Sequence, residues 1–278
     1  MPELPEVEAV ARALNECLSG RVIIDARLLR ERLAKTVSPE TFTRALSSST
    51  INFVHRRGKH LLFDLDNKNT LITHLRMSGK FELLDAHDSD PKFTHAVFQL
   101  DGGTRLVFHD QRHFGHMNVA STEALGSCPE LQKLAPEPLS DDFDEAYFHG
   151  VMSATSRSIK AVLLDQTKVC GLGNIYASES LYLARVNPVT SASRISRQKL
   201  LALLEAIKSV LQTAISYSAS RSIDPKDFES GYYSSGGERR WLVYDREGQP
   251  CLTCRSPIKR IKQDGRSSYF CSRCQRKR

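Results

Sequence analysis

The stretch CLTCRSPIKRIKQDGRSSYFCSRC, residues 251–274, decides how the C-terminal part of the chain folds. Four of the seven cysteines stand here as Cys251-x2-Cys254 and Cys271-x2-Cys274, with 16 residues between the pairs. Zn²⁺ takes four thiolates in a tetrahedron, and paired cysteines at this spacing are typical of such sites. Two disulfides would use the same residues, but a reducing cytosol disfavours them. The pattern therefore predicts a zinc finger with one structural Zn²⁺ held by all four thiolates.

Positive charge is concentrated in the same part of the chain. Residues 251–278 carry nine Lys and Arg and one acidic residue, Asp264, a net charge of +8. The whole chain is +7, so residues 1–250 sum to −1. Clustered cations displace counterions from nucleic acid, so the pattern favours a polyanionic partner. A solvated basic tail is the simpler alternative.

The composition is that of a globular protein with more than one domain. The 278 residues are 40% hydrophobic and 26% charged, which excludes a disordered or fibrous chain. No apolar run approaches the length of a membrane span. The start MPELPEVE is acidic and contains two prolines, whereas a signal peptide needs a basic start and an apolar core. We expect a cytoplasmic protein without a membrane partner.

Apolar periodicity predicts a helix followed by a β-domain in the first half of the chain. The helix begins at Pro5, carries apolar residues at helical spacing and ends at Gly20. Short runs with β-branched or aromatic residues follow, separated by turn residues, and 101–103 (DGG) indicates a hairpin. The expected strands are 21–29, 50–56, 60–65, 70–76, 80–84, 95–100 and 104–109. Strands with no helices between them indicate an antiparallel β-sandwich.

The pattern changes to a helical period in the second half. Residues 126–145, with Pro and Gly and an acidic cluster, resemble a linker, and 196–217 carry the apolar stripe of a core helix. Residues 220–237 are polar and glycine-containing, as expected of a loop before the finger. We predict an α+β protein of three parts, residues 1–134, 135–236 and 237–278.

The N-terminus could supply a nucleophile. If Met1 is removed, Pro2 has a free secondary amine with an ordinary pKa near 8, so part of it is neutral at pH 7 and can attack a sugar carbon to form an iminium. Glu3 beside it could transfer protons. A proline-started acidic helix cap without any chemistry is the alternative.

Four further motifs have residue types suited to DNA. Lys59, in RRGKH, could reach an active site from a strand start, although a solvated strand end is equally consistent. Met77, in HLRMSG, and Arg112 and Phe114, in FHDQRHFG, could fill the space left by an extruded base, although Met and Phe are more often core residues. The glycine turn GLGNIYASE opens a helix whose N–H groups favour a phosphate, or it simply joins two helices.

Taken together and in this order, these motifs and the four-cysteine finger resemble the formamidopyrimidine-DNA glycosylase family over essentially the whole chain. The resemblance implies an N-terminal antiparallel β-sandwich bearing a terminal helix, a helix-two-turns-helix domain and a C-terminal zinc finger. It also implies a monomeric, bacterial-type base-excision repair enzyme acting on double-stranded DNA with oxidised bases or abasic sites. Such an enzyme removes formamidopyrimidines, and 8-oxoguanine opposite cytosine, through an N-terminal proline Schiff base. Its AP lyase activity then cuts the strand by β- and δ-elimination.

The resemblance also assigns roles to individual residues. Pro2 corresponds to the nucleophile, Glu3 to its acid/base partner and Lys59 to the hairpin lysine used in lesion processing. Met77, Arg112 and Phe114 match the residues inserted in place of the flipped base. The positions that match residues holding the DNA backbone are Lys160, Asn174, Tyr244 and Arg266.

Two loops depart from the family pattern, and two other functions remain open. The common D-P-R-R-F-G loop has Gln111 and His113 at its second and fourth positions, and the lesion-covering loop has ASRS at 219–222, with Lys226 beyond it. A zinc-finger DNA-binding protein without catalysis would explain the charge and the cysteines. An endonuclease VIII-type enzyme acting on oxidised pyrimidines would have the same fold, but Leu4 and the inserted residues favour the purine enzyme.

Overall fold

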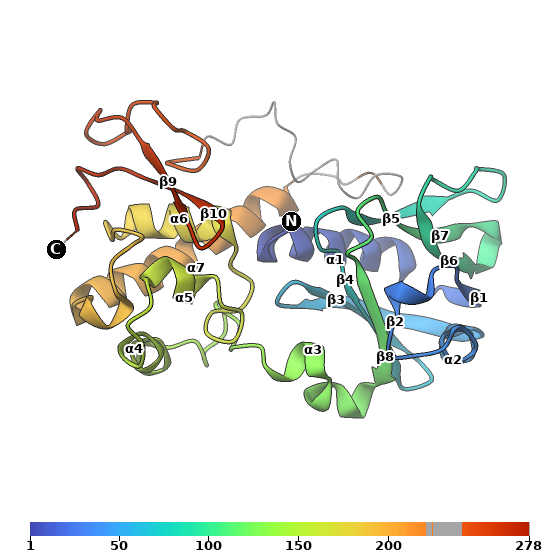
Figure 1. Cartoon of the computed structure of the whole chain (residues 1–278). Coiled ribbons are helices and arrows are strands. Elements are labelled where there is room, and N and C mark those ends of the chain that lie inside the picture. The colour runs from blue at the N-terminus through green and yellow to red at the C-terminus, as the bar shows by residue number, and fades with distance from the viewer. Residues whose placement is uncertain (221–223, 225–240, 278) are drawn as a thin grey trace. The chain divides into compact units, whose positions relative to one another are not determined.

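The computed structural model describes residues 1–220, 224 and 241–277 (Figure 1). The chain divides into two compact units, which are described separately. The first is Met1–Gln132 with Tyr217–Ser235, and the second is Lys133–Ser216 with Gly236–Arg278. The part of the expected loop 220–237 that includes Arg221, Ser222 and Lys226 lies outside the described residues.

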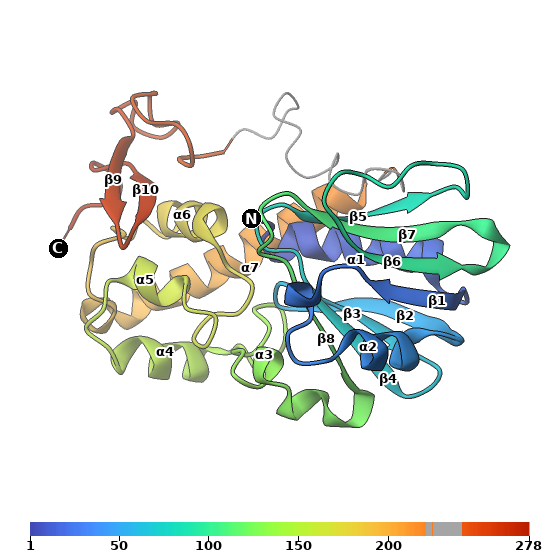
Figure 2. The same cartoon turned by 45° about the vertical axis from the view of Figure 1, so that its right-hand side comes forward.

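The first unit is an antiparallel β-sandwich. Its strands are β1 (Val22–Leu28), β2 (Ser49–Arg57), β3 (His60–Leu65), β4 (Asn69–His74), β5 (Gly79–Leu84), β6 (Thr94–Leu100), β7 (Arg105–Asp110) and β8 (His116–Ser121). Hydrogen bonds link them in the order β5-β7-β6-β1-β2-β3-β4-β8, and Figure 2 shows the first four side by side. Only two residue pairs, Val22↔Thr50 and Ile23↔Ser49, join β1 to β2. The sheet can therefore fold over at this junction into two layers, which confirms the predicted sandwich.

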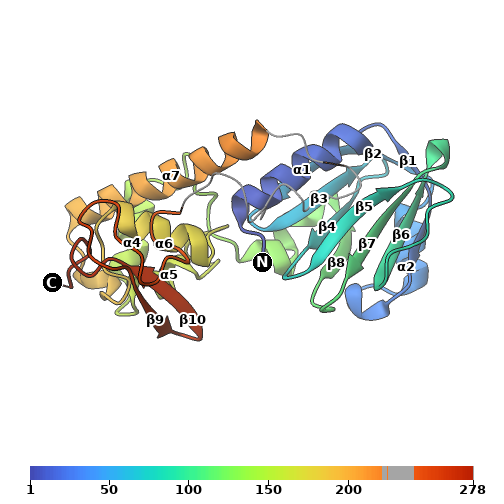
Figure 3. The same cartoon turned by 90° about the horizontal axis from the view of Figure 1, so that it is seen from above.

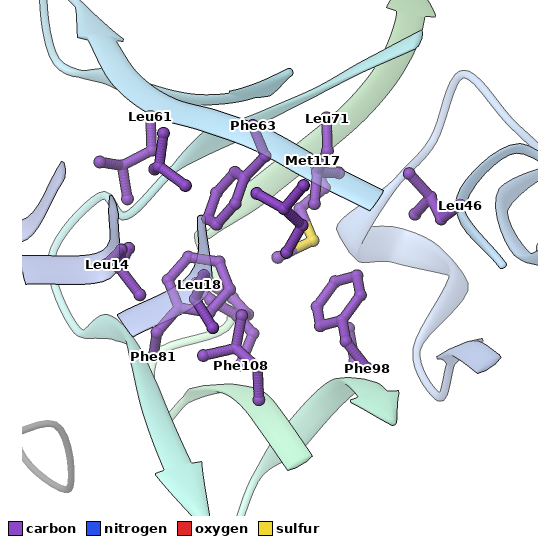
Figure 4. Packing of buried hydrophobic residues seen from close by; sticks show 14 of the residues in the cluster. Leu14, Leu18, Leu46, Leu61, Phe63, Leu71, Phe81, Phe98, Phe108 and Met117 are labelled. Atoms are coloured by element: carbon purple, nitrogen blue, oxygen red, sulfur yellow. The ribbon is translucent and has the colours of Figure 1, made fainter. Parts of the chain in front are cut away.

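Leucine, phenylalanine and methionine side chains fill the space between the layers (Figure 4). Phe63 on β3 lies 5.4 Å from Phe81 on β5, and Phe81 lies 5.1 Å from Phe108 on β7, between ring centroids. Helix α1 (Leu4–Leu18) adds Leu14 and Leu18 to this core. Because its apolar stripe is buried, the helix holds the first residues of the chain against the sandwich.

Several predicted boundaries are corrected. α1 begins at Leu4, one residue before the predicted start, with Glu3 as its N-cap. The strand predicted at 70–76 ends at His74, because Arg76 adopts a left-handed φ of 56° that no strand accommodates. Hairpin β6–β7 turns at Asp101–Gly103 as predicted.

Helix α2 (Pro39–Leu46) and strand β8 are among the elements that were not predicted from the sequence. Helix α2 has an N-cap, Ser38, whose side chain accepts a hydrogen bond from the Thr41 N–H. Strand β8 carries polar residues that hide its period, and its pairing with β4 identifies it. Part of the predicted linker is ordered as the 3₁₀ helix Thr122–Ser127 and α3 (Pro129–Gln132).

The second unit contains helices and the finger. Its helices are α4 (Glu145–Ser153), α5 (Ile159–Leu163), α6 (Asn174–Leu183) and α7 (Arg197–Ala219), and its strands are β9 (Lys259–Gln263) and β10 (Arg266–Phe270), which Figure 3 shows as a hairpin. The β9–β10 turn has positive φ at both Asp264 (49°) and Gly265 (77°), as the type I′ turn of a two-residue hairpin requires. Tyr182 of α6 packs with Cys251 and Tyr269 of the finger.

Helix α7 corrects the expectation that no apolar run approaches the length of a membrane span. It is long and apolar enough to cross a membrane by length and composition, with 44% of the apolar window buried. Its buried residues recur at helical spacing, and Glu205 lies exposed between them. This is the amphipathic pattern predicted for a core helix. A core helix can be as long and as apolar as a membrane-spanning helix.

Candidate DNA-processing site

Pro2 and Glu3 are buried at the start of α1. Glu3 is 3% exposed and forms a capping box with Glu6, in which the Glu3 N–H donates to Glu6 Oε2 at 2.9 Å. A capping box satisfies helix N–H groups that have no partner within the helix. It therefore fixes Glu3 relative to the helix axis, with Pro2 directly before it in the chain. The predicted nucleophile and its carboxylate partner are neighbours in a well-defined structure.

Lys59 lies in the two-residue turn between β2 and β3, beside the predicted strand start. Gly58 supplies the positive φ, 60°, at the first turn position, where a type II′ turn requires it. Lys59 is only 4% exposed, and buried lysines are rarely found without polar partners. Nearby Arg56 binds Glu8 Oε2 at 2.7 Å, so Glu8 is used in an ion pair and does not add a free acid to the N-terminal group.

Two buried histidines lie next to this turn. The rings of His60 and His74 meet edge to face at 4.7 Å between centroids. Burial is the main cause that lowers the pKa of His60 to about 4 and that of His74 to about 2, with a further contribution to His74 from Lys59. Both rings are therefore neutral at pH 7. The unprotonated Nδ1 of His74 accepts the Arg76 N–H at 3.0 Å, which stabilises the left-handed backbone before Met77.

The structure brings the Met77 loop and the Arg112–Phe114 loop together through Asp110. The Asp110 carboxylate is fully buried and accepts hydrogen bonds from Ser78 Oγ (2.5 Å), the Arg112 N–H (3.1 Å) and the Gly115 N–H (2.6 Å). The Arg112 N–H also reaches Ser78 Oγ at 3.0 Å. Burial alone would raise the pKa of Asp110, but these hydrogen bonds outweigh it and lower the pKa. Asp110 is therefore an anion at neutral pH, and it holds both loops.

The tips of these loops are exposed. Met77 is 44% and Phe114 55% exposed, and the Arg112 guanidinium lies 5.2 Å from the centroid of the Phe114 ring. Exposed apolar side chains beside a cation could stack in a kinked duplex. The alternative that Met77 and Phe114 are core residues is wrong. Ser78 and Asp110 stand in the motifs HLRMSG and FHDQRHFG, respectively, but nothing in the sequence marked either residue as the link between the two loops.

In the second unit, Lys160 and Asn174 lie in different environments. Lys160 is 1% exposed, and its ammonium donates to Ser267 O at 2.8 Å and Ser268 Oγ at 2.9 Å of β10. It therefore joins α5 to the finger. Asn174 is the first residue of α6, directly after Gly173, the N-cap. Its side-chain Oδ1 is buried without a hydrogen-bond partner among the described residues.

A buried carboxylate also organises the entrance to the finger. Glu179 of α6 is 3% exposed and accepts the N–H groups of Leu242, Val243 and Tyr244 at 2.7 to 2.9 Å. These bonds fix the backbone at Tyr244, whose ring packs against Tyr269 at 5.1 Å. Glu179 stands in the glycine-turn motif GLGNIYASE, but nothing in the sequence indicated this role.

Arg266 follows the tight turn of the β9–β10 hairpin and is exposed. Arg157, Lys160 and Arg266 line one cavity of about 620 Å³ together with Asp165 and Asp264. Both signs of charge therefore lie around it.

The four finger cysteines fit a zinc ion. Their sulfur atoms all lie within 4.8 Å of one another, with Cys251–Cys274 at 3.9 Å and Cys254–Cys271 at 3.4 Å. Zn–S bonds of about 2.3 Å in a tetrahedron require S–S separations of about 3.8 Å. Hydrogen bonds from Ser256 lower the pKa of Cys254 to about 6, which favours the thiolate. These residues form a structural Zn²⁺ site, and all four ligands come from the protein.

Comparisons with known proteins agree with this architecture. Family profiles described as the formamidopyrimidine-DNA glycosylase N-terminal domain, its H2TH domain, and the zinc finger found in FPG and IleRS match residues 1–117, 134–224 and 248–276. The chain is 41% identical to the formamidopyrimidine-DNA glycosylase of Phenylobacterium zucineum and 40% identical to that of Herpetosiphon aurantiacus, covering 99% of this chain and 100% of each relative.

Solved structures of Lactococcus lactis Fpg are similar over the same length. Its complex with DNA containing an abasic site matches with a TM-score of 0.90 at 33% identity. Its complex with DNA containing N7-benzyl-Fapy-dG matches with a TM-score of 0.90 at 34% identity. Both matches cover 99% of this chain and 100% of the other.

Proposed function

Since the chain belongs to the formamidopyrimidine-DNA glycosylase family, base-excision repair DNA glycosylases with AP lyase activity, we propose that it excises oxidised purines through a Schiff base formed by Pro2. The proposed substrates are formamidopyrimidines, and 8-oxoguanine opposite cytosine, in double-stranded DNA. The relative from Lactococcus lactis, solved with Fapy-containing and abasic DNA, supports this substrate class. We also propose that the protein acts as a monomer in the cytoplasm, on DNA of the nucleoid.

The observation that carries the mechanism is the burial of both Pro2 and Glu3 at the start of α1, where the capping box fixes Glu3. After removal of Met1, the lone pair of the Pro2 nitrogen attacks C1′ of the damaged nucleotide. The glycosidic C–N bond breaks, and the base leaves with its bonding electrons and takes a proton. Opening of the sugar ring then gives an iminium between Pro2 and C1′.

Strand cleavage follows from this iminium. It acidifies the C2′ hydrogen, and loss of that proton expels the 3′ phosphate in β-elimination. A second elimination releases the 5′ phosphate, and water hydrolyses the remaining iminium to free Pro2. Glu3 is the proposed proton carrier, and Lys59 is proposed to contact the phosphate beside the lesion.

Loops held by Asp110 supply the groups that replace the extruded base. Met77 and Phe114 fill the gap in the stack, and Arg112 offers paired donors to the orphaned cytosine. Extrusion costs a few kcal/mol and is easier for a poorly paired lesion.

The second unit is proposed to hold the DNA backbone. Asn174, Tyr244 and Arg266 present a helix start, a packed ring and an exposed cation for this purpose. Lys160 is proposed to contribute through the finger strand that it binds, since its ammonium is buried against β10. Zinc stabilises the finger and takes no part in the chemistry.

Borohydride trapping tests this function. A duplex containing 8-oxoguanine opposite cytosine is incubated with the protein and reduced, and the adduct is mapped by mass spectrometry. We expect a covalent bond to residue 2 of protein lacking Met1. Pro2→Gly should lose excision and the adduct while retaining DNA affinity.

Parallel duplexes test the substrate class. Adducts formed only with oxidised pyrimidines would replace the purine assignment by an endonuclease VIII-type one. Wild-type excision by Pro2→Gly would exclude Pro2 as the nucleophile. Binding without nicking of any lesion duplex would indicate a DNA-binding protein without catalysis.

A further inference from the structure

A histidine in the loop between β7 and β8 is hydrogen-bonded to a second histidine, which lies on β6. His113 lies between Arg112 and Phe114 and has a left-handed φ of 59°. Its Nδ1 lies 3.0 Å from Nε2 of His95 on β6, and the two rings stack at 5.0 Å with an interplanar angle of 18°. A left-handed backbone is unfavourable for a residue with a side chain, so this contact stabilises a conformation that the chain would otherwise avoid.

The two rings have different surroundings. His95 is 3% exposed within the sandwich, whereas His113 is exposed and meets the Phe93 ring edge to face at 5.5 Å. The Phe93 carbonyl accepts the Asp110 N–H at 3.1 Å, so the histidine pair borders the carboxylate that holds both loops.

Charged and titratable groups surround His95 on several elements. Burial is the largest cause that lowers the pKa of His95, followed by His113 and Arg30, with a smaller contribution from His109. Asp110 acts in the opposite direction. Lys92 is a further cation near the pair, with its ammonium 5.0 Å from the centroid of the Phe93 ring. The net effect of these groups is a lowered pKa, so His95 is neutral at pH 7.

An N–H···N bond between imidazoles needs one donor and one unprotonated acceptor. With His95 neutral, its Nε2 can accept from Nδ1 of His113, whether His113 is neutral or protonated. When His95 is also protonated, two donors face one another and the bond is lost. The tether therefore persists at neutral pH and fails in acid.

We propose that His95 and His113 are positioning residues that hold the loop 111–114 in the conformation from which Arg112 and Phe114 enter DNA. The DNA-related part of this proposal rests on the proposed function. The common family loop has an arginine at position 113, whereas in this chain a hydrogen-bonded pair of rings fixes the turn. Neither histidine contacts the reacting atoms.

Nitrogen NMR tests the pair without DNA. In protein labelled with ¹⁵N at histidine, we expect a scalar coupling across the hydrogen bond between His113 Nδ1 and His95 Nε2 at pH 7.5. The coupling should disappear on acidification and be absent from His113→Asn, since asparagine tolerates the left-handed backbone but lacks the ring. Absence of the coupling at pH 7.5, in protein with a native spectrum, would overturn the proposal.

DNA binding tests the consequence. The measurement is the ratio of affinities for a duplex with a tetrahydrofuran abasic analogue and for an undamaged duplex, because a change in overall charge affects both. His113→Asn should lower this ratio roughly three- to tenfold at pH 7.5, as expected for one lost hydrogen bond. His95→Gln is the matched control, since its amide oxygen can accept from His113 at any pH.

The pH profile separates the pair from a merely structural role. As the pH is lowered from 7.5 through the depressed pKa of His95, the ratio should fall for the wild type and stay constant for His95→Gln. Equal falls in both proteins, or an unchanged ratio in His113→Asn, would refute the positioning role. A visible coupling in a protein without any preference for the abasic duplex would support the tether and instead refute the proposed function.

Discussion

Asp110→Asn should destabilise the N-terminal unit far more than its small change in size implies. The carboxylate is fully buried and accepts hydrogen bonds from Ser78, Arg112 and Gly115. Asparagine keeps one acceptor oxygen, and its NH₂ group faces a main-chain N–H. One charge-assisted bond is lost, at about 1.5–3 kcal/mol, and the others become weaker neutral bonds. The expected loss in free energy of unfolding at pH 7 is about 3 kcal/mol.

The effect of Asp110→Asn should depend on pH in a defined direction. The hydrogen bonds lower the pKa of Asp110 in the folded protein, so the unfolded state binds its proton at a higher pH than the folded state. The stabilisation is therefore complete above the ordinary aspartate pKa of about 3.9 and is lost as the pH falls through the lower folded value. Wild type and variant should approach one another in stability only in strong acid.

Urea unfolding followed by circular dichroism measures this difference. Asp25→Asn is the matched control, because Asp25 forms an exposed pair with Arg27 at 3.6 Å and such pairs contribute about 0–1 kcal/mol. Affinity for an abasic-analogue duplex should fall with Asp110→Asn, since both inserted loops lose their common anchor. A loss below about 1 kcal/mol, equal to that of the control, would refute the assignment of Asp110 as the anchor.

Other changes test the loops and the finger. Gly115→Ala should cost about 1–3 kcal/mol in urea unfolding, because a Cβ there would lie 2.8 Å from a ring atom behind the loop, whereas Gly126→Ala has open space and should be near neutral. Cys254→Ser should lose zinc and DNA affinity together, measured by metal analysis and fluorescence anisotropy; normal binding by zinc-free protein would contradict a structural finger. Tyr182→Phe removes a hydroxyl 3.1 Å from a ligand sulfur, so a chelator should extract zinc faster, and an unchanged rate would show that the hydroxyl is dispensable. Arg266→Gln should reduce the slope of log affinity against log salt by about 0.9, and an unchanged slope would exclude a phosphate contact.

Local signals in the sequence were sufficient for most of the fold. Short runs of β-branched and aromatic residues between turn residues predicted most of the sandwich strands, and the DGG turn was correctly placed. The cysteine spacing predicted a site whose four sulfur atoms do lie together. These features succeed because each depends on residues close in sequence, whose periodicity or spacing is a direct consequence of local geometry.

Strand β8 and helix α2 show where local signals fail. β8 (HMNVAS) mixes polar and apolar residues because its side chains meet different partners, including Asn118 with Glu130 at 3.2 Å. Its identity as a strand is set by its pairing with β4, more than 40 residues earlier. α2 had a usable signal, Ser38 followed by Pro39, which the strand-rich context obscured.

For the candidate site, the sequence identified the exposed tips and missed what holds them. Asp110 binds Ser78 32 residues away, and Glu179 binds the Leu242 N–H 63 residues away. Such contacts leave no periodic pattern, because a buried carboxylate and an exposed one look alike in a sequence. Burial is what gives them their effect, since a charge-assisted hydrogen bond contributes most where water is excluded.

Buried polar residues also hold the backbone of other exposed residues near the predicted site. The backbones of Arg76 and His113 are left-handed, at φ of 56° and 59°. Each conformation is stabilised by a polar group from the sandwich, His74 for the first and His95 for the second. Exposed side chains that must enter DNA lose less conformational freedom on binding when their backbone is already fixed. We therefore expect the buried polar residues to contribute to DNA affinity without touching DNA, and their substitution to weaken lesion binding more than binding to an undamaged duplex.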